Sequence, residues 1–156
     1  MRILFICSGN ICRSPMAAEY ARHQAAQAGL SHLLIDSAGT LGIEGAPASE
    51  NAVELLRENG QDLSSHRSRG LRKSDMTAFD MILVMEHHHQ EELEYRYPGS
   101  NEAVFLLRAF DDGPDPSHGA PDLDDPIGES MEVYRARFRE IRNAVDHLMI
   151  HLRNPG

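Results

Sequence analysis

The 156-residue sequence contains few cysteines, no long apolar run and little positive charge. Its two cysteines, Cys7 and Cys12, lie too close together to form a disulfide framework, so a reducing, cytoplasmic environment is expected. No apolar stretch is long enough to span a membrane, and the N-terminus lacks the pattern of a signal peptide. The formal net charge of −9 argues against nucleic acid as a partner. The length predicts a single domain over residues 1–156.

The start of the chain contains groups suited to phosphate chemistry. Residues 7–14 read Cys-Ser-Gly-Asn-Ile-Cys-Arg-Ser and follow a short apolar run at residues 3–6. The run predicts a buried parallel strand, and Ser14 and Pro15 predict the start of a helix with Ser14 as its N-cap. The loop between strand and helix could then direct its amide groups, together with the helix dipole, at a bound anion.

Three residues of this loop have distinct expected roles. Cys7 would lie beneath a bound phosphorus as the nucleophile, because nearby positive charge favours its thiolate. Arg13 offers a fixed fork of donors for phosphate oxygens, and Gly9 allows the backbone to approach a ligand closely. The spacing Cys-x5-Arg also occurs by chance, in which case two buried cysteines simply lie beside a surface arginine. The strand before the loop and the helix after it favour the phosphate site.

Strands and helices alternate along the rest of the chain. Besides the strand at 3–6, apolar runs predict strands at 33–36 (ending at 37–39), 79–85 and 103–107. Helices are predicted at 16–28, 49–59, 86–95 and 130–152. This alternation predicts an α/β fold of three layers: a four-stranded parallel sheet with helices on both faces, in a flavodoxin-like, doubly wound topology. Ligands of such folds bind at the carboxyl ends of the strands, where the Cys7 loop is expected.

A thiolate that attacks a phosphate ester also needs a proton donor for the leaving group. The same group can later activate the water that hydrolyses the cysteinyl phosphate. The acidic, proline-rich segment at 111–128 offers six candidates: Asp111, Asp112, Asp115, Asp122, Asp124 and Asp125. Aspartates beside prolines are usually turn formers, so a purely structural role is the alternative for all six.

The segment Phe5-Ile6-Cys7-Ser8-Gly9-Asn10-Ile11-Cys12-Arg13-Ser14-Pro15 resembles the signature of the low-molecular-weight protein tyrosine phosphatases. Other Cys-x5-Arg phosphatases carry a histidine before the cysteine and place the loop deep in the chain. The resemblance covers essentially the whole sequence and implies a four-stranded sheet. It also implies that Asp125, in Asp-Asp-Pro-Ile-Gly before the last helix, is the general acid and base. Asp124 is the alternative, because a shift of one residue could present its carboxylate instead.

The same resemblance implies supporting roles. Asn10 would hold the phosphate loop in shape, and Ser14 would hydrogen-bond the thiolate. Ser37 and His66 match the residues that support this asparagine, although His66 alone suggests a surface histidine. The expected substrate-binding residues are Ser8, Gly9, Asn10, Ile11, Cys12 and Ser14. A reversible disulfide between the two cysteines is also implied, and loop packing is the alternative role for Cys12.

Phosphotyrosine in a protein is the predicted substrate. Ile11 is bulky and apolar and suits a phenyl ring, whereas the related protein arginine phosphatases tend to carry threonine there. Against this, Ile127 and Gly128 stand where tyrosine phosphatases usually have aromatic residues, so an arginine phosphatase remains the alternative. An arsenate reductase is disfavoured because no cysteine follows Cys12, and a non-catalytic anion-binding module because nucleophile and acid are both present.

No metal or cofactor is predicted. The run His87-His88-His89 suggests a metal site, but three consecutive helical residues point in three directions. The expected partner is a phosphorylated protein, with neither nucleic acid nor membrane, and the chain is expected to be a monomer or a weak dimer.

Overall fold

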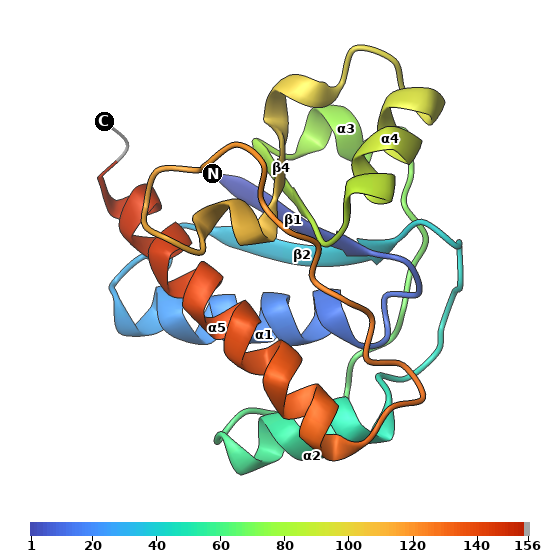
Figure 1. Ribbon diagram of the computed structural model, residues 1–156, viewed down its shortest axis with the longest axis vertical. Coiled ribbons are helices and arrows are strands. Elements are labelled where there is room, and N and C mark those ends of the chain that lie inside the picture. Colours follow the sequence, from blue (N-terminus) through green and yellow to red (C-terminus); the bar gives the residue numbers. More distant parts are fainter. Residues whose placement is uncertain (155–156) are drawn as a thin grey trace.

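A four-stranded sheet forms the centre of the molecule in the computed structural model, which describes residues 1–154 (Figure 1). Its strands are β1 (Arg2–Cys7), β2 (Leu34–Gly39), β3 (Met81–Val84) and β4 (Val104–Leu106). They lie in the order β2-β1-β3-β4, and all neighbours are parallel. The predicted four-stranded parallel α/β fold is therefore confirmed. The end of the predicted domain, residues 155–156, lies outside the described residues.

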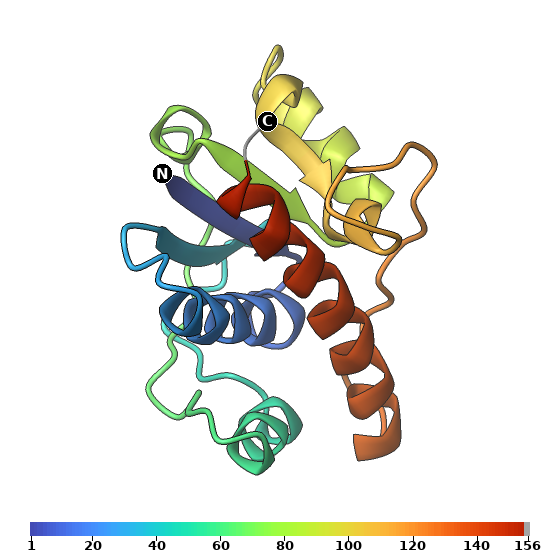
Figure 2. The same ribbon diagram turned by 90° about the vertical axis from the view of Figure 1, so that its left-hand side faces the viewer.

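Helices cover both faces of this sheet, as the two views in Figures 1 and 2 show. The helices are α1 (Arg13–Gln27), α2 (Glu50–Glu58), α3 (Asp75–Ala78), α4 (His87–Arg96) and α5 (Met131–Arg153), with two 3-10 turns at Asn101–Ala103 and Leu107–Phe110. α1 and α5 pack against each other on one face, and α4 packs against β3 and β4 on the other. Within residues 1–154, no helix combines the length and the apolar character that crossing a membrane requires.

The long helix α5 covers the sheet through a single apolar stripe. Its stripe residues follow each other at steps of three or four, and all of them are buried: Tyr134, Phe138, Ile141, Val145, Leu148 and Leu152. This spacing places one side chain per turn on the same face of a helix. The Ser130 hydroxyl caps the first turn by accepting a hydrogen bond from the Val133 amide at 3.4 Å. The helix therefore begins immediately after the acidic segment that holds the candidate acids.

The start of α1 differs from the prediction. The helix begins at Arg13 with Cys12 at the N-cap position, and no side chain caps it. Ser14, predicted to be the cap, lies inside the first turn because its hydroxyl instead contacts Cys7 and Asn10 at 2.9 Å each. The first amide groups of α1 therefore have no side-chain partner from the cap residue. Helix ends of this kind bind anions.

Candidate active site

The loop after β1 curls around a small cleft at the carboxyl end of the sheet. The cleft has a volume of about 230 Å³ and is bordered by the loop, by the segment after β2 and by the segment before α5. Its lining residues are Cys7, Ser8, Gly9, Ile11, Cys12, Arg13, Leu41, Ile43, Asp125 and Ile127. In Figure 1 the orange segment before α5 passes beside the loop that joins β1 to α1. Segments far apart in the sequence thus meet at the predicted phosphate loop.

The loop lies directly against the end of β2. The sheet register pairs Cys7 with Gly39, and a β-carbon on Gly39 would lie 2.7 Å from the Ser8 carbonyl oxygen and 3.0 Å from the Asn10 nitrogen. Both distances are shorter than ordinary van der Waals contact, and both neighbours are backbone atoms. Only glycine therefore allows the loop to approach β2 this closely.

Asn10 holds the loop in its curled shape. Its φ of 58° is in the left-handed region, which asparagine tolerates better than most residues. The side-chain amide nitrogen donates to the hydroxyls of Ser14 and Ser37, each at 2.9 Å, and the side-chain oxygen accepts from the Arg69 amide at 3.0 Å. The backbone oxygen accepts from His66 Nε2 at 2.8 Å. The structure thus brings Ser37 and His66 to the asparagine that they were expected to support.

His66 acts in this network as a hydrogen-bond donor. A carbonyl oxygen can only accept, so the Nε2 atom that contacts Asn10 must carry the proton. Burial lowers the pKa of His66 below its ordinary value. The ring is therefore neutral at neutral pH, and its remaining proton stays on the side that faces the loop.

The Cys7 sulfur accepts hydrogen bonds from within the loop. It lies 2.9 Å from the Ser14 hydroxyl oxygen and 3.3 Å from the Asn10 nitrogen, and its residue is 2% exposed. Because Ser14 already accepts a proton from the Asn10 side chain, its own proton can be donated to the sulfur. Hydrogen bonds from an amide and a hydroxyl stabilise the charged form of a group, so the geometry suits a thiolate.

Arg13 is almost completely buried beneath the loop. Its Nη1 atom donates to Glu86 Oε1 and to the Leu123 carbonyl oxygen, both at 2.8 Å, and Nη2 lies 3.5 Å from Asp125 Oδ2. Among residues 1–154, its buried Nε atom has no hydrogen-bond partner. The Nη1 corner is fixed, and the edge formed by Nε and Nη2 can bind two oxygens of one phosphate group.

Of the six candidate acids, Asp125 is the one that lines the cleft. Its side chain is 37% exposed, and its Oδ1 accepts from the Ile127 amide at 3.1 Å. Asp124 is 77% exposed and instead pairs with Arg137 at 3.3 Å. The others pair elsewhere or are exposed: Asp111 contacts Arg108, Asp122 contacts His87, and Asp112 and Asp115 lie at the surface. The geometry therefore favours Asp125 over Asp124.

The Cys12 side chain contacts α5 and the residue before α2. Its sulfur lies 3.2 Å from the Tyr134 hydroxyl and 3.4 Å from the Ser49 hydroxyl. Burial raises the pKa of Cys12 above its ordinary value, and burial also raises the pKa of Tyr134 to about 12. Both cysteines are free thiols, so the disulfide between them stays a prediction.

Glu86 is a site residue that the sequence did not reveal. It follows β3 by two positions, and the register that pairs Ile6 with Val84 places it at the same sheet edge as Cys7. The available signal was an acidic residue directly after a predicted buried strand, at the sheet edge where the Cys7 loop was expected. Its carboxylate supplies the negative charge that Arg13 needs in a buried position.

Two of the three consecutive histidines gather with Glu86, contrary to the expectation that all three diverge. Ligand atoms of Glu86, His88 and His89 lie within 4.8 Å of one another, whereas His87 turns to Asp122. Each of these ligand atoms already has a protein partner: the carboxylate contacts Arg13 and His88, and the His89 ring contacts the Glu86 amide and Ser8. A metal ion would have to displace these contacts, so we assign none.

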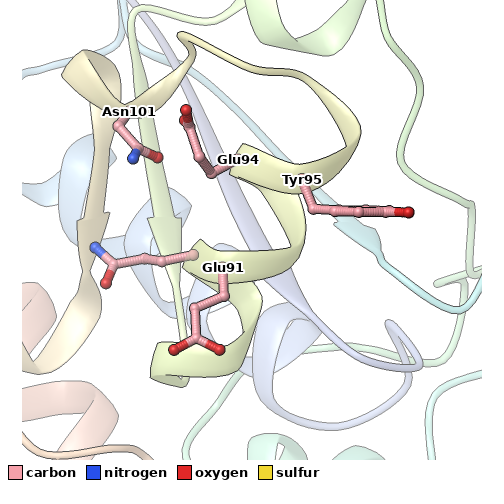
Figure 3. Close-up of a pocket in the computed structure, with 5 residues that line it drawn as sticks. Glu91, Glu94, Tyr95 and Asn101 are labelled. Carbon is pink, nitrogen blue, oxygen red and sulfur yellow. The ribbon is translucent and has the colours of Figure 1, made fainter.

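A second hollow lies on the outer side of α4 (Figure 3). It is lined by Gln90, Glu91, Glu94, Tyr95 and Asn101, and the Tyr95 ring extends away from the helix and is 88% exposed. Its two carboxylates repel an anion, and these lining residues include neither a cation nor a thiol. This hollow therefore lacks the groups that phosphate chemistry needs, whereas the cleft at Cys7 is lined by a thiol and a guanidinium.

Comparison with known proteins gives relatives of two specificities. A protein-arginine-phosphatase from Geobacillus stearothermophilus is 36% identical over 94% of this chain and 93% of its own length. A probable low-molecular-weight protein-tyrosine-phosphatase from Ralstonia solanacearum is 34% identical over 99% of this chain and 97% of its own length. The crystal structure of a low-molecular-weight protein tyrosine phosphatase from T. tengcongensis, 36% identical, superposes with a TM-score of 0.87 and covers 96% of this chain and 98% of its own. The family model for low molecular weight phosphotyrosine protein phosphatases matches residues 2–155, so this chain belongs to that family of cysteine-dependent phosphatases.

Proposed function

We propose that this phosphatase hydrolyses phosphotyrosine in proteins through a phosphoryl group carried on Cys7. The phosphoryl oxygens bind the loop amides and the Nε and Nη2 edge of Arg13. The Cys7 thiolate attacks phosphorus, and the bond from phosphorus to the phenolic oxygen breaks. That oxygen takes the bonding electrons and a proton from Asp125, which lines the same cleft.

The second step returns the enzyme to its starting state. Asp125, now a carboxylate, takes a proton from a water molecule as the water oxygen attacks phosphorus. The bond from phosphorus to sulfur breaks, and inorganic phosphate is the product. The departing sulfur becomes a thiolate that the Ser14 hydroxyl and the Asn10 amide stabilise, at 2.9 and 3.3 Å.

The aliphatic walls of the cleft support phosphotyrosine as the substrate. Ile11 lies at the loop, and three further aliphatic side chains surround the opening: Leu41 (67% exposed), Ile43 (38% exposed) and Ile127 (48% exposed). A phenyl ring bound between them would remove apolar surface from water. A phosphorylated guanidinium carries N–H donors that this wall would leave unpaired, at a cost of about 1–3 kcal/mol for each buried donor.

A protein arginine phosphatase is the second candidate. The cleft walls are aliphatic instead of aromatic, so they lack the stacking contribution of roughly 0.5–1.5 kcal/mol that aromatic pairs add. Asp125 also offers an acceptor at the cleft for a guanidinium N–H. Similarity to an arginine phosphatase is as high as similarity to tyrosine phosphatases.

Replacing Ile11 with threonine is expected to lower the ratio of kcat/KM for phosphotyrosine over phosphoarginine by about 10-fold. Threonine removes apolar contact with a ring, about 0.8 kcal/mol per lost methylene, and adds a hydroxyl that can accept from a guanidinium. Matched peptides that differ only in the phosphorylated residue measure the ratio. Ile150→Thr on the far part of α5 is the control and should leave the ratio unchanged. If the wild-type enzyme cleaves the phosphoarginine peptide faster, the tyrosine assignment is wrong.

Gly39→Ala is expected to weaken both phosphate binding and folding. The new β-carbon would displace the Ser8 carbonyl or the Asn10 amide, since backbone atoms leave it no flexible neighbour to move. We expect kcat/KM to fall at least about 10-fold and stability to drop by about 1–3 kcal/mol, the usual cost of overpacking. Steady-state kinetics and urea unfolding measure the two effects. Gly113→Ala, which has no atom within 4 Å of its new β-carbon, is the matched control; wild-type kinetics in Gly39→Ala would contradict the close packing.

A further inference from the structure

The start of α4 is closed by a reciprocal pair of side chains. The Glu86 carboxylate accepts from the backbone amide of His89, and His89 Nδ1 accepts from the backbone amide of Glu86 at 3.0 Å. Such a capping box satisfies amide groups that a helix start would otherwise leave unpaired. In most helices its function ends there.

Here both side chains of the capping box continue to the phosphate loop. Glu86 Oε1 accepts from Arg13 at the end of the loop, and His89 Nε2 lies 2.9 Å from the hydroxyl oxygen of Ser8 at its beginning. One helix end therefore holds the loop at two points. The contact between His89 and Ser8 has no role in the mechanism described above.

The direction of the hydrogen bond between His89 and Ser8 follows from the capping box. A backbone amide can only donate, so Nδ1 carries no proton, and the proton of the neutral ring is on Nε2. The ring is fully buried, and its burial lowers the pKa of His89 to about 3. His89 is therefore neutral under ordinary conditions, and its Nε2 donates to Ser8.

Ser8 is left with its own proton to donate. Its hydroxyl accepts from His89, and among residues 1–154 it has no other hydrogen-bond partner. Ser8 is half-buried and lines the catalytic cleft. A hydroxyl that already accepts from a fixed donor presents its proton to its other neighbours, and the species that binds in this cleft is an anion.

We propose that His89 is a positioning residue that turns the Ser8 hydroxyl into an oriented donor for an oxygen of the bound phosphoryl group. The inference rests on the proposed function for the place where the phosphoryl group binds. It does not depend on whether tyrosine or arginine carries that group. It adds one side-chain donor to the amides and the guanidinium that hold the phosphate.

Calorimetric titration with inorganic phosphate tests this inference without any turnover. Ser8→Ala removes the donor, and His89→Leu removes the group that orients it while filling much of the buried volume. His89→Gln keeps an acceptor for the helix cap and an N–H donor, and Ser8→Thr keeps the hydroxyl. His147→Leu is the matched control. His147 lies on α5 away from the cleft, is partly buried, and contacts the carbonyl oxygen of Phe110.

We expect Ser8→Ala and His89→Leu each to raise the dissociation constant of phosphate by about 3- to 10-fold, as loss of one hydrogen bond does. The double variant should bind no more weakly than the weaker single variant, because both changes remove the same contact. His89→Gln and Ser8→Thr should bind within about twofold of the wild type, and His147→Leu should unfold more easily without a change in phosphate affinity.

Two results would overturn the inference. One is wild-type phosphate affinity in Ser8→Ala, which can be measured even if His89→Leu fails to fold. The other is fully additive losses in the double variant, which would mean that His89 only caps α4. The proposed function fails separately: a protein that binds phosphate as predicted but hydrolyses neither phosphorylated peptide would support the inference and reject the proposed reaction.

Discussion

Replacement of Cys7 by serine is expected to lower kcat by at least about 10⁴-fold, since removal of a catalytic nucleophile can cost about 10⁶-fold. Hydrogen bonds from Asn10 and Ser14 at 3.3 and 2.9 Å favour a thiolate at this position, but they cannot ionise an ordinary hydroxyl to a useful extent. Phosphate should still bind, because the loop amides and Arg13 remain. Initial rates with a phosphotyrosine peptide and an aryl phosphate measure the loss, and calorimetry with inorganic phosphate measures the retained affinity.

Cys12→Ser is the matched control for this prediction. Its sulfur lies in the same loop but contacts Tyr134 and Ser49, and burial raises the pKa of the Cys12 thiol, which disfavours a nucleophilic thiolate there. We expect kcat to fall by less than about 10-fold, the cost of disturbing one or two neutral hydrogen bonds. If Cys12→Ser lost activity as completely as Cys7→Ser, the assignment of a single nucleophile would be wrong.

Asp125→Ala is expected to have the second largest effect, and its size should depend on the leaving group. For phenyl phosphate, whose leaving group needs a proton, kcat should fall by about 10²- to 10⁴-fold. For an aryl phosphate that carries strongly electron-withdrawing substituents, the first step needs little proton donation and should slow far less. Single-turnover release of the phenol measures this step for a series of aryl phosphates.

Asp124→Ala is the neighbouring control. Its side chain is 77% exposed and pairs with Arg137 at the surface, so the dependence on the leaving group should match that of the wild type. The rate of phenol release can be compared across the series of leaving groups. If this rate depended on the leaving group equally in Asp125→Ala and the wild type, or more steeply in Asp124→Ala than in the wild type, the acid would lie elsewhere in the segment at 111–128.

The fold and the position of the Cys7 loop between β1 and α1 could be predicted because their signals are local. The run Ile3–Ile6 is apolar at every position, and all four residues are completely buried in β1, as a central parallel strand requires. The apolar stripe of α5 is equally clear in the sequence, and it places one buried residue on each turn of the helix. Within the loop, only five residues separate Cys7 from Arg13, so their proximity needed no knowledge of the tertiary structure.

Other features depend on contacts between distant segments, and sequence patterns do not show them. Serine is a common N-cap residue, but the hydroxyl of Ser14 is hydrogen-bonded to Asn10 and Cys7 instead, and α1 begins earlier than predicted. The four-residue helix α3 and the two 3-10 turns are too short to show a period. The role of Glu86 depends on the register between β1 and β3. Family resemblance selected Asp125 among six aspartates, and the structure shows that Asp125 lines the cleft.

The negative net charge of the chain is compatible with the proposed local binding of phosphate. The chain carries a net charge of −9, and Glu86 and Asp125 both approach the guanidinium of Arg13. The attraction for a phosphate dianion is therefore expected to come from the loop amides and the start of α1 as much as from the positive charge of Arg13. Such dipoles act at short range, and because the fold already holds them in place, little free energy is spent on reorienting them when the anion binds. Surface charge variants should thus change association rates more than the chemical step.

Trapping of the phosphorylated enzyme tests the central claim most directly. In Asp125→Ala the water that hydrolyses the intermediate lacks its base, so the phosphoryl group should accumulate when an activated aryl phosphate is mixed with the enzyme and the reaction is stopped rapidly in acid. Peptide mass spectrometry should then find one phosphoryl group on Cys7. The amount of phosphorylated Cys7 should rise together with the amount of phenol released in the burst. A stoichiometric burst with no phosphoryl group on Cys7, or with the group on another residue, would contradict the mechanism.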